Sequence, residues 1–284
     1  MEEHRSVIAG YDGSDEAAAA IRWAARHARQ RSLPLHVVHC SLWPLLTRNL
    51  GPVPGVAGSG LERAAEAVLE EGLQIAQAAA PALDIDATLL HGLPASHLAA
   101  VSARQELVVV GSRGLGGFLG LLVGSVSLEL AATASCPVAV IRSDLHPDGP
   151  VVVAVDALGS PAALSDACTL ASAAQAALTV IHVHQTPAGY AHHGRHWGGD
   201  AAGAVLQEAL HRARKQAPSV PVDGSVLHDV SVPHAILEAS AAARMVVVGT
   251  KGQGLLRETI GSTAHAVLHH AQGPVLVSRR GGSY

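Results

Sequence analysis

The chain has 284 residues, of which 49% are hydrophobic and 2% aromatic, and its formal net charge at pH 7 is −4. This charge argues against a nucleic-acid-binding protein, which needs a basic stripe to replace the counterions of phosphate groups. No run of 18 apolar residues appears and the first residues lack the apolar segment of a signal peptide, so we expect a cytoplasmic protein outside membranes.

Strands and helices alternate along the first half of the chain. Apolar runs predict strands up to about residue 12, at 35–40, near 85–90, at 107–111 and at 136–142. The segments between them predict helices at 17–29 and about 61–80, a short helix from residue 94 and a helix from residue 125. Strict alternation indicates parallel strands joined by right-handed crossovers. We therefore predict an α/β fold in which each half forms an open, twisted, five-stranded parallel sheet with helices on both faces.

The second half of the chain repeats the first. Val-Val-Val-Gly-Ser-Arg-Gly at 108–114 is echoed by Val-Val-Val-Gly-Thr-Lys-Gly at 246–252, and Gly-Ser at 124–125 is echoed at 261–262. Asp, His, Pro and Gly interrupt the apolar pattern near 144–150. Two domains also suit the length, because single cores stop growing at roughly 250–300 residues. The predicted domains are 1–145 and 149–284.

The strongest candidate for a binding site follows the strand at 107–111. Its spacing is Gly111-x2-Gly114-x9-Gly124-Ser125, and it lies at the carboxyl end of a strand, where open parallel sheets bind ligands. Glycines let the backbone approach an anion, and the N-terminus of the next helix favours phosphate. Since a glycine-rich loop is about as often a plain turn, this pattern alone leaves both interpretations open.

A second candidate is Asp12, which follows the first strand and precedes Gly13 and Ser14. Its carboxylate is suited to accept hydrogen bonds from a ribose or an adenine. However, Asp, Gly and Ser also commonly begin an alanine-rich helix. The local pattern therefore favours a ligand contact and a helix cap about equally.

Together these motifs resemble the universal stress protein family, and its ATP-binding branch in particular. The resemblance rests on Gly-Tyr-Asp-Gly-Ser at 10–14, on the glycine loop and on the Cys-Pro-Val-Ala-Val strand at 136–140, and it covers nearly the whole chain twice. It implies the strand order 3-2-1-4-5 of an adenine nucleotide α-hydrolase-like or Rossmann-like fold, with Asp12 and the glycine loop facing one cleft. It also implies ATP as the ligand, with Mg²⁺ as a bridging ion and adenine near His39 and Cys40. The candidate ligand-binding residues of the first half are Gly10, Asp12, His39, Gly111, Arg113, Gly114, Gly124, Ser125 and Val126.

The second half departs from the family pattern in two places. Its loop, Gly249-x2-Gly252-x8-Gly261-Ser262, is one residue shorter, and Asp156 is followed by Ala-Leu-Gly-Ser instead of Gly-Ser. A shortened loop is still able to bind, with Lys251 as an added charge. Unequal occupancy of the two halves therefore stays open. The candidate residues here are Asp156, Gly249, Gly252, Gly261 and Ser262.

The 18 histidines raise the question of metal binding. His192, His193 and His196 cluster in a segment that corresponds to the Pro/Gly-rich loop at 43–60. Imidazoles suit Zn²⁺ or Ni²⁺, but a solvated loop is the favoured interpretation, so we predict no metal site. His39 and His184 end the second strand of each half, which would place both of them at the nucleotide clefts.

The sequence lacks the GxxxxGK[ST] loop of the common nucleotide-hydrolysing enzymes. We therefore expect a stress-response or dormancy regulator that binds ATP without turning it over, with at most weak hydrolysis. The alternatives are a scaffold for protein partners, a slow Mg²⁺-dependent ATPase and a cyclic AMP binder. The resemblance also implies that the last strands of the two halves pair edge to edge, which would protect two sheet edges. A homodimer is a further expected assembly.

Overall fold

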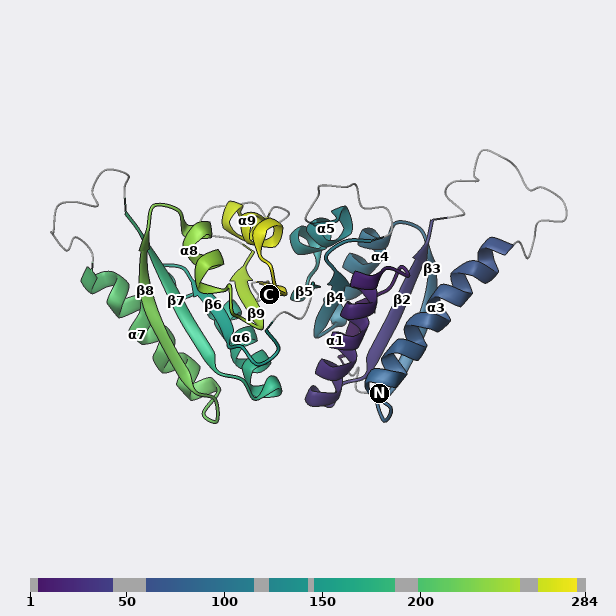
Figure 1. The fold of residues 1–284 in the computed structure, drawn as a ribbon, viewed down its shortest axis with the longest axis horizontal. Helices are drawn as coiled ribbons and strands as arrows, with labels where there is room; N and C mark the ends of the chain where they lie inside the picture. The colour runs from purple at the N-terminus through teal and green to yellow at the C-terminus, as the bar shows by residue number, and fades with distance from the viewer. Residues whose placement is uncertain are drawn as a thin grey trace. The chain divides into compact units, whose positions relative to one another are not determined.

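The computed structural model describes residues 5–42, 60–114, 123–142, 146–186, 199–250 and 260–279 (Figure 1). The chain divides into two compact units, Met1–Arg142 and Ser143–Tyr284. Each unit contains a five-stranded parallel sheet with helices on both faces, which confirms the predicted fold class.

In the first unit the strand order is β3-β2-β1-β4-β5, and every neighbouring pair is parallel. This is the order 3-2-1-4-5 that the family resemblance implied. The strands are β1 (Val7–Gly10), β2 (Leu35–Ser41), β3 (Ile85–His91), β4 (Leu107–Gly111) and β5 (Val138–Ile141). The helices are α1 (Asp15–Arg31), α3 (Gly60–Ala79), α4 (Pro94–Val101) and α5 (Ser125–Thr133), with a 3-10 turn η1 (Ser102–Arg104).

The second unit has the equivalent order β8-β7-β6-β9-β10, again with parallel neighbours. Its strands are β6 (Val151–Val155), β7 (Leu178–Gln185), β8 (Val222–Asp229), β9 (Met245–Gly249) and β10 (Val275–Ser278). Its helices are α6 (Pro161–Ala174), α7 (Gly199–Gln216), α8 (Val232–Ala239) and α9 (Ser262–His270).

Right-handed crossovers decide which helices share a face. The chain first moves outward from β1 to β3 and then returns to β4, so α1 and α3 cover one face while α4 and α5 cover the other. Accordingly, α1 packs beside α3 and α4 beside α5. Because the strands of the unit are parallel, their carboxyl ends all lie at one edge of the sheet, where a ligand would bind.

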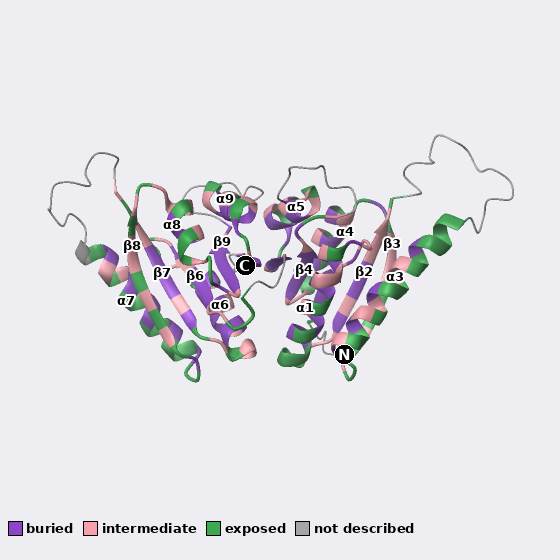
Figure 2. Ribbon diagram, in the orientation of Figure 1, coloured by how far each residue is buried: buried purple, intermediate pink, exposed green. Residues whose placement is uncertain are grey.

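The core lies between the strands and the inner faces of the helices (Figure 2). Four alanines of α1, at positions 20, 24, 25 and 28, are fully buried. Small side chains let this helix approach the sheet closely, while the outward faces of α3 and α7 are largely exposed (Figure 2). Among the described residues, none of the helices is both long enough and apolar enough to cross a membrane.

The first strand ends earlier than predicted. β1 ends at Gly10, two residues before Asp12, because the next residues form a tight turn held by side chains. Helix α1 then begins at Asp15 with Ser14 as its N-cap, whose hydroxyl accepts a hydrogen bond from the Ala17 N–H at 3.2 Å. The cap and two acidic residues in the first turn complement the positive end of the helix dipole.

Candidate functional site

Asp12 lies in contact with the glycine loop. Its Oδ1 accepts hydrogen bonds from the Ser14 N–H at 3.1 Å and from the Ser14 hydroxyl at 2.6 Å. Its Oδ2 faces Gly114 so closely that a Cβ atom at that position would overlap it. Since β1 and β4 are neighbours, the turns that follow them meet at the carboxyl edge. The structure thus brings Asp12 and Gly114 together.

The contacts around Asp12 show which residue caps helix α1. Ser14, and not Asp12, caps helix α1. Asp12 instead holds the capping serine through one carboxylate oxygen. The Ser14 hydroxyl also lies 3.4 Å from the Arg113 carbonyl, which ties the turn after β1 to the loop after β4.

Gly111 is required by packing. A Cβ atom there would stand 2.8 Å from the backbone nitrogen of Ala17 and from the carbonyl carbon of Glu16. The first turn of α1 therefore rests directly on the end of β4. The Gly111 carbonyl accepts a hydrogen bond from the Ser127 hydroxyl at 2.8 Å, which anchors α5 to the same strand. Gly10 is less confined, with 3.3 Å from an added Cβ to Leu98 and Val110.

Helix α5 begins at the same edge, and no side chain caps it. Its N-cap is Gly124, whose N–H donates to the Ser112 carbonyl at 2.7 Å. Ser125 is exposed and Val126 is half-buried in the first turn. Because the first N–H groups of a helix have no partners within it, an N-terminus without a side-chain cap is suited to an anion.

Two arginines lie near this helix start. Arg113 is exposed and pairs with Glu16 at 2.8 Å. Arg142, which directly follows β5, was not among the predicted residues; its pKa is lowered by burial and then by the positive charge of Arg113. Both guanidinium groups would attract an anion that is bound near this helix start. The sequence signal that could have identified Arg142 is its position as a basic residue directly after the last strand of the unit.

His39 ties the end of β2 to the end of β1. Its Nδ1 lies 2.7 Å from the Tyr11 carbonyl oxygen, with Cys40 next along the strand. The Tyr11 ring packs on Gly72 of α3, where an added Cβ would come within 2.7 Å of it. Burial, followed by the negative charge of Glu71 and a hydrogen bond to it, raises the pKa of Tyr11 to about 12. Tyr11 is therefore neutral and structural, and His39 is fixed beside Asp12.

In the second half the counterpart of His39 is His182. Its Nδ1 lies 3.0 Å from the Val155 carbonyl, the same contact that His39 makes with Tyr11. The strand register agrees, since Leu35 pairs with the first residue of β1 and Leu178 with the first residue of β6. His184 lies one residue before the end of β7, as the sequence predicted, and in this register it corresponds to Ser41 of β2.

In the turn after β6, the Asp156 carboxylate accepts hydrogen bonds from residues of the same turn. Asp156 Oδ1 accepts from the N–H groups of Leu158 at 2.9 Å and Ser160 at 3.2 Å, and the Ser160 hydroxyl accepts from the Asp156 N–H at 3.0 Å. Ser160 is the N-cap of α6, four positions after Asp156, whereas Ser14 is two positions after Asp12. The second turn is thus two residues longer than the first.

The packing around the end of β9 and the longer turn is more open than at the equivalent place in the first half. A Cβ atom at Gly249 would meet no described residue within 4 Å, in contrast to Gly111. An open cavity of about 290 Å³ separates the turn from α7; its lining residues are Ala157, Leu158, Gly159, Ala204, Val205, Glu208, Ala209 and Arg212. Gly261 keeps its place as N-cap of α9 and donates to the Thr250 carbonyl at 2.7 Å, with Ser262 exposed beside it. Gly252, Lys251 and the histidines 192, 193 and 196 lie outside the described residues.

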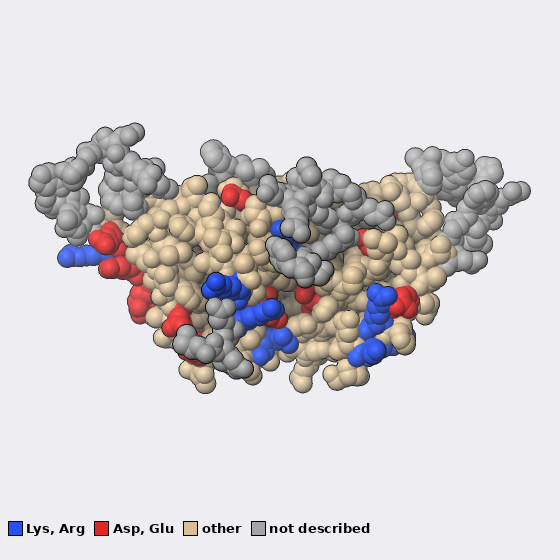
Figure 3. All heavy atoms as spheres, turned by 180° about the vertical axis from the view of Figure 1, so that it is seen from behind, with Lys and Arg blue, Asp and Glu red and all other residues tan. Residues whose placement is uncertain are grey.

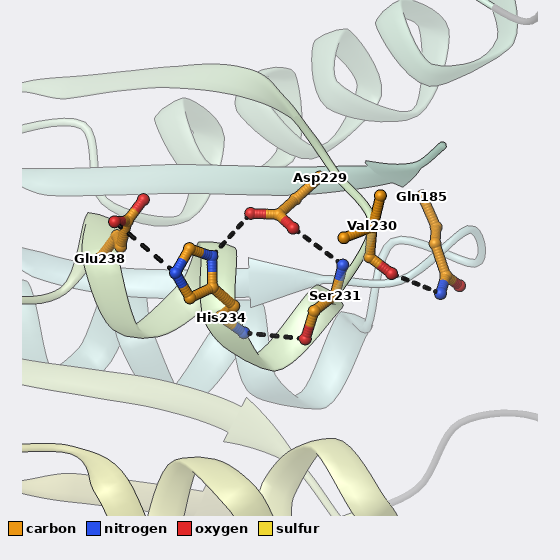
Figure 4. A network of polar contacts seen from close by, with 6 residues as sticks. All are labelled: Gln185, Asp229, Val230, Ser231, His234 and Glu238. Carbon is orange, nitrogen blue, oxygen red and sulfur yellow. Dashed lines mark hydrogen bonds and ion pairs between the residues drawn. The ribbon is translucent and has the colours of Figure 1, made fainter. Parts of the chain in front are cut away.

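A separate polar cluster begins helix α8 (Figure 4). The His234 ring lies between Asp229, with Nδ1 to Oδ2 at 2.8 Å, and Glu238, with Nε2 to Oε1 at 3.7 Å. Asp229 also accepts from the Ser231 N–H, and the Ser231 hydroxyl accepts from the His234 N–H at 3.4 Å. Since both ring nitrogens face carboxylates, this arrangement serves to begin the helix and not to activate a nucleophile.

We expect the His234 pKa to lie above its usual value, because of the hydrogen bond to Asp229 and then the charge of Glu238. The pKa of Asp229 is lowered by the hydrogen bond to His234 and then by that from Ser231. Stabilisation from His234 is fully present below pH 6.5 and is lost as the pH rises through its raised pKa; that from Asp229 is present above pH 3.8 and is lost below its lowered pKa. An NMR titration of the His234 ring should show the raised pKa, and Asp229→Asn should bring it down. A pKa that does not respond to Asp229→Asn would contradict this account.

Figure 3 shows how charge is distributed over one face of the molecule. Lys and Arg gather in small groups close to Asp and Glu, and no continuous basic stripe crosses the described part of this face (Figure 3).

Known proteins were found to resemble both halves of the chain. The model of the universal stress protein family matches residues 3–142 and again residues 149–279. Universal stress protein Rv2005c of Mycobacterium tuberculosis is 35% identical over 303 residues, with 98% of each chain covered. Universal stress protein Rv1996 of the same organism is 31% identical, with 96% of this chain and 94% of the other covered. A solved universal stress protein from Archaeoglobus fulgidus has the same fold, with a TM-score of 0.71 at 23% identity over 98% of this chain and 97% of that one.

Proposed function

Because this chain belongs to the universal stress protein family, we propose that its first half binds an adenine nucleotide, with ATP as the expected form. The observation that carries the proposal is the contact of Asp12 with Gly114 at the carboxyl edge. It places a carboxylate beside a glycine loop, next to a helix start that no side chain caps.

The two parts of the site suit the two parts of a nucleotide. The N-terminus of α5, with Arg113 and Arg142 nearby, favours the phosphates. Asp12 is suited to accept hydrogen bonds from the hydroxyl or amino groups of the nucleoside. Mg²⁺ fits this donor set if phosphate oxygens supply most of its ligands, as they commonly do, and it would neutralise the phosphate charge.

We further propose that the protein binds and senses the nucleotide in a stress response or in dormancy, with at most slow hydrolysis. Its cytoplasmic location, a homodimer and the pairing of the last strands of the two halves remain predictions. The second half supports a different role. Its turn after β6 is two residues longer than the turn after β1, so we expect one nucleotide per chain.

Isothermal titration of the full chain with ATP and Mg²⁺ tests the site. We expect a stoichiometry near one, and no binding by Gly114→Glu, whose carboxylate would displace Asp12 and repel phosphate. Asp12→Ala should weaken binding by about 10- to 100-fold, the effect of losing hydrogen bonds to a charged group. Cyclic AMP, titrated in parallel, should bind more weakly than ATP.

Two variants serve as controls. Ser14→Ala removes the cap of α1 but keeps the carboxylate, so it should weaken binding less than Asp12→Ala; equal losses would mean that Asp12 acts only through the cap. Asp156→Ala should leave the stoichiometry unchanged. A well-folded wild-type chain that takes up no adenine nucleotide would refute the proposal.

The scaffold function is favoured for the second half by the turn after β6, which is two residues longer than the turn after β1. Thermal unfolding separates the two roles, since a ligand at 100 times its Kd adds about 2.7 kcal/mol to the state that binds it. We expect ATP to protect the amides of α1 and α5 from hydrogen exchange, with little change in α6 and α9. Equal protection of both halves would exclude a purely scaffolding second half.

A further inference from the structure

Helix α9 carries two histidines on one face. His265 and His269 are four positions apart, so their side chains lie above one another on the helix. Their ring centroids are 4.5 Å apart, and the ring planes are inclined by 43°. His265 is exposed and His269 is half-buried, so solvent reaches the pair.

We propose that His265 and His269 together bind one divalent transition-metal ion, of the Cu²⁺, Ni²⁺ or Zn²⁺ class. Two histidines at this spacing on a helix are able to ligate one metal, as in helical zinc motifs. Bonds of about 2.0–2.1 Å from zinc to imidazole nitrogen require the two nitrogens to converge on a common point. Rings whose centroids are 4.5 Å apart need only side-chain rotation to meet this requirement.

The chemistry of the donors selects the metal. Imidazole suits Cu, Ni and Zn ions, whereas Mg²⁺ and Ca²⁺ prefer oxygen ligands. Affinity should follow the usual order, with Cu²⁺ bound most tightly. No cluster of three or more His, Cys, Asp or Glu that would hold a metal occurs in the described ranges. In the proposed site the two imidazoles supply the protein ligands, and water completes the coordination.

The pair belongs to the second half alone. Counting from the N-caps Gly124 and Gly261, the positions of α5 that correspond to the two histidines hold Leu128 and Ala132. A bound ion would link the first two turns of α9, directly after the Gly261-Ser262 start. The second half thus acquires a ligand site that does not depend on the proposed nucleotide site of the first.

Copper titration of the full chain, without nucleotide, tests the proposal. Because the chain has 18 histidines, total copper uptake is not informative, and the readout is line broadening of individual histidine ring protons in NMR at substoichiometric Cu²⁺. We expect the signals of His265 and His269 to broaden first. His265→Gln and His269→Gln should each weaken the tightest site by about 100-fold, since the second ligand of a chelate binds intramolecularly.

His270→Gln is the matched control, because His270 lies next on the same helix with its ring 6.3 Å from that of His269. It should leave the tightest site unchanged within about threefold. Far-ultraviolet circular dichroism reports whether each variant keeps its helices. If the two glutamine variants bind Cu²⁺ like the wild type, or if His270→Gln loses as much affinity as they do, the proposed site is wrong.

Discussion

Gly111→Ala is expected to lower the free energy of unfolding by about 1–3 kcal/mol, the usual cost of forcing extra atoms into a packed site. The added methyl group would stand 2.8 Å from the backbone of Ala17 and Glu16. The end of a flexible side chain can rotate away from an added methyl group, but the backbone of a helix cannot. The first turn of α1 would have to move away from β4, which would also displace Ser14 and Asp12.

Gly249→Ala is the control that the repeat itself provides. Position 249 corresponds to 111, yet in the part of the chain that the structure describes an added Cβ there meets nothing within 4 Å. This variant should be neutral or stabilising by up to about 1 kcal/mol, because alanine restricts the unfolded chain. Urea unfolding measures both values, and hydrogen exchange of α1 amides locates the effect. Equal destabilisation by the two changes would show that Gly111 is not specifically confined.

The second large effect is expected from His27, a buried histidine of α1. Its side chain is 6% exposed and stacks on Trp23, with ring centroids 4.9 Å apart. Burial and then the charge of Arg31 lower the pKa of His27 to about 4, from an ordinary value of 6.5. The folded protein therefore holds His27 neutral at pH values where the unfolded chain protonates it.

The sign of the pH effect follows from this difference. Above pH 6.5 the contribution of His27 to stability is complete, and it is lost as the pH falls from 6.5 to about 4, where the folded state also becomes protonated. At about 1.4 kcal/mol per pH unit, the loss is about 3 kcal/mol. Urea unfolding at pH 7 and at pH 4.5 should show most of this loss.

Substitutions isolate the contribution of His27 from that of other groups. His27→Gln removes the ionisable group, so its stability should fall by about 2–3 kcal/mol less than that of the wild type over the same pH range. His211→Gln, at an exposed position of α7, should follow the wild type. A His27→Gln variant with the full wild-type pH dependence would assign the effect to other groups.

Much of this structure could be predicted from patterns within single segments. The alternation of elements and the repeat gave the fold class, and the family resemblance gave the strand order. Adjacent strands one and four also predict that Asp12 and the glycine loop meet, and Asp12 does lie against Gly114. Such features depend on apolar periodicity and on topology, both of which a sequence displays directly.

Other features depend on contacts between distant residues. The need for glycine at 111 comes from the first turn of α1, almost 100 residues earlier. The role of Ser14 as cap, the position of His182 opposite Val155 and the closeness of Arg142 to Arg113 depend on register and side-chain direction. The sequence showed that Asp156 lacks a following Gly-Ser. It did not show that the N–H groups of Leu158 and Ser160 would donate hydrogen bonds to the Asp156 carboxylate.

The longer turn after β6 has a consequence for how the two copies are able to change over time. In the first copy, residue 111 is confined by a helix, and any side chain there would displace the first turn of α1. In the second copy an added Cβ at 249 meets no described residue within 4 Å, so steric contact there does not require glycine. Substitutions should therefore be tolerated more easily at position 249 than at position 111.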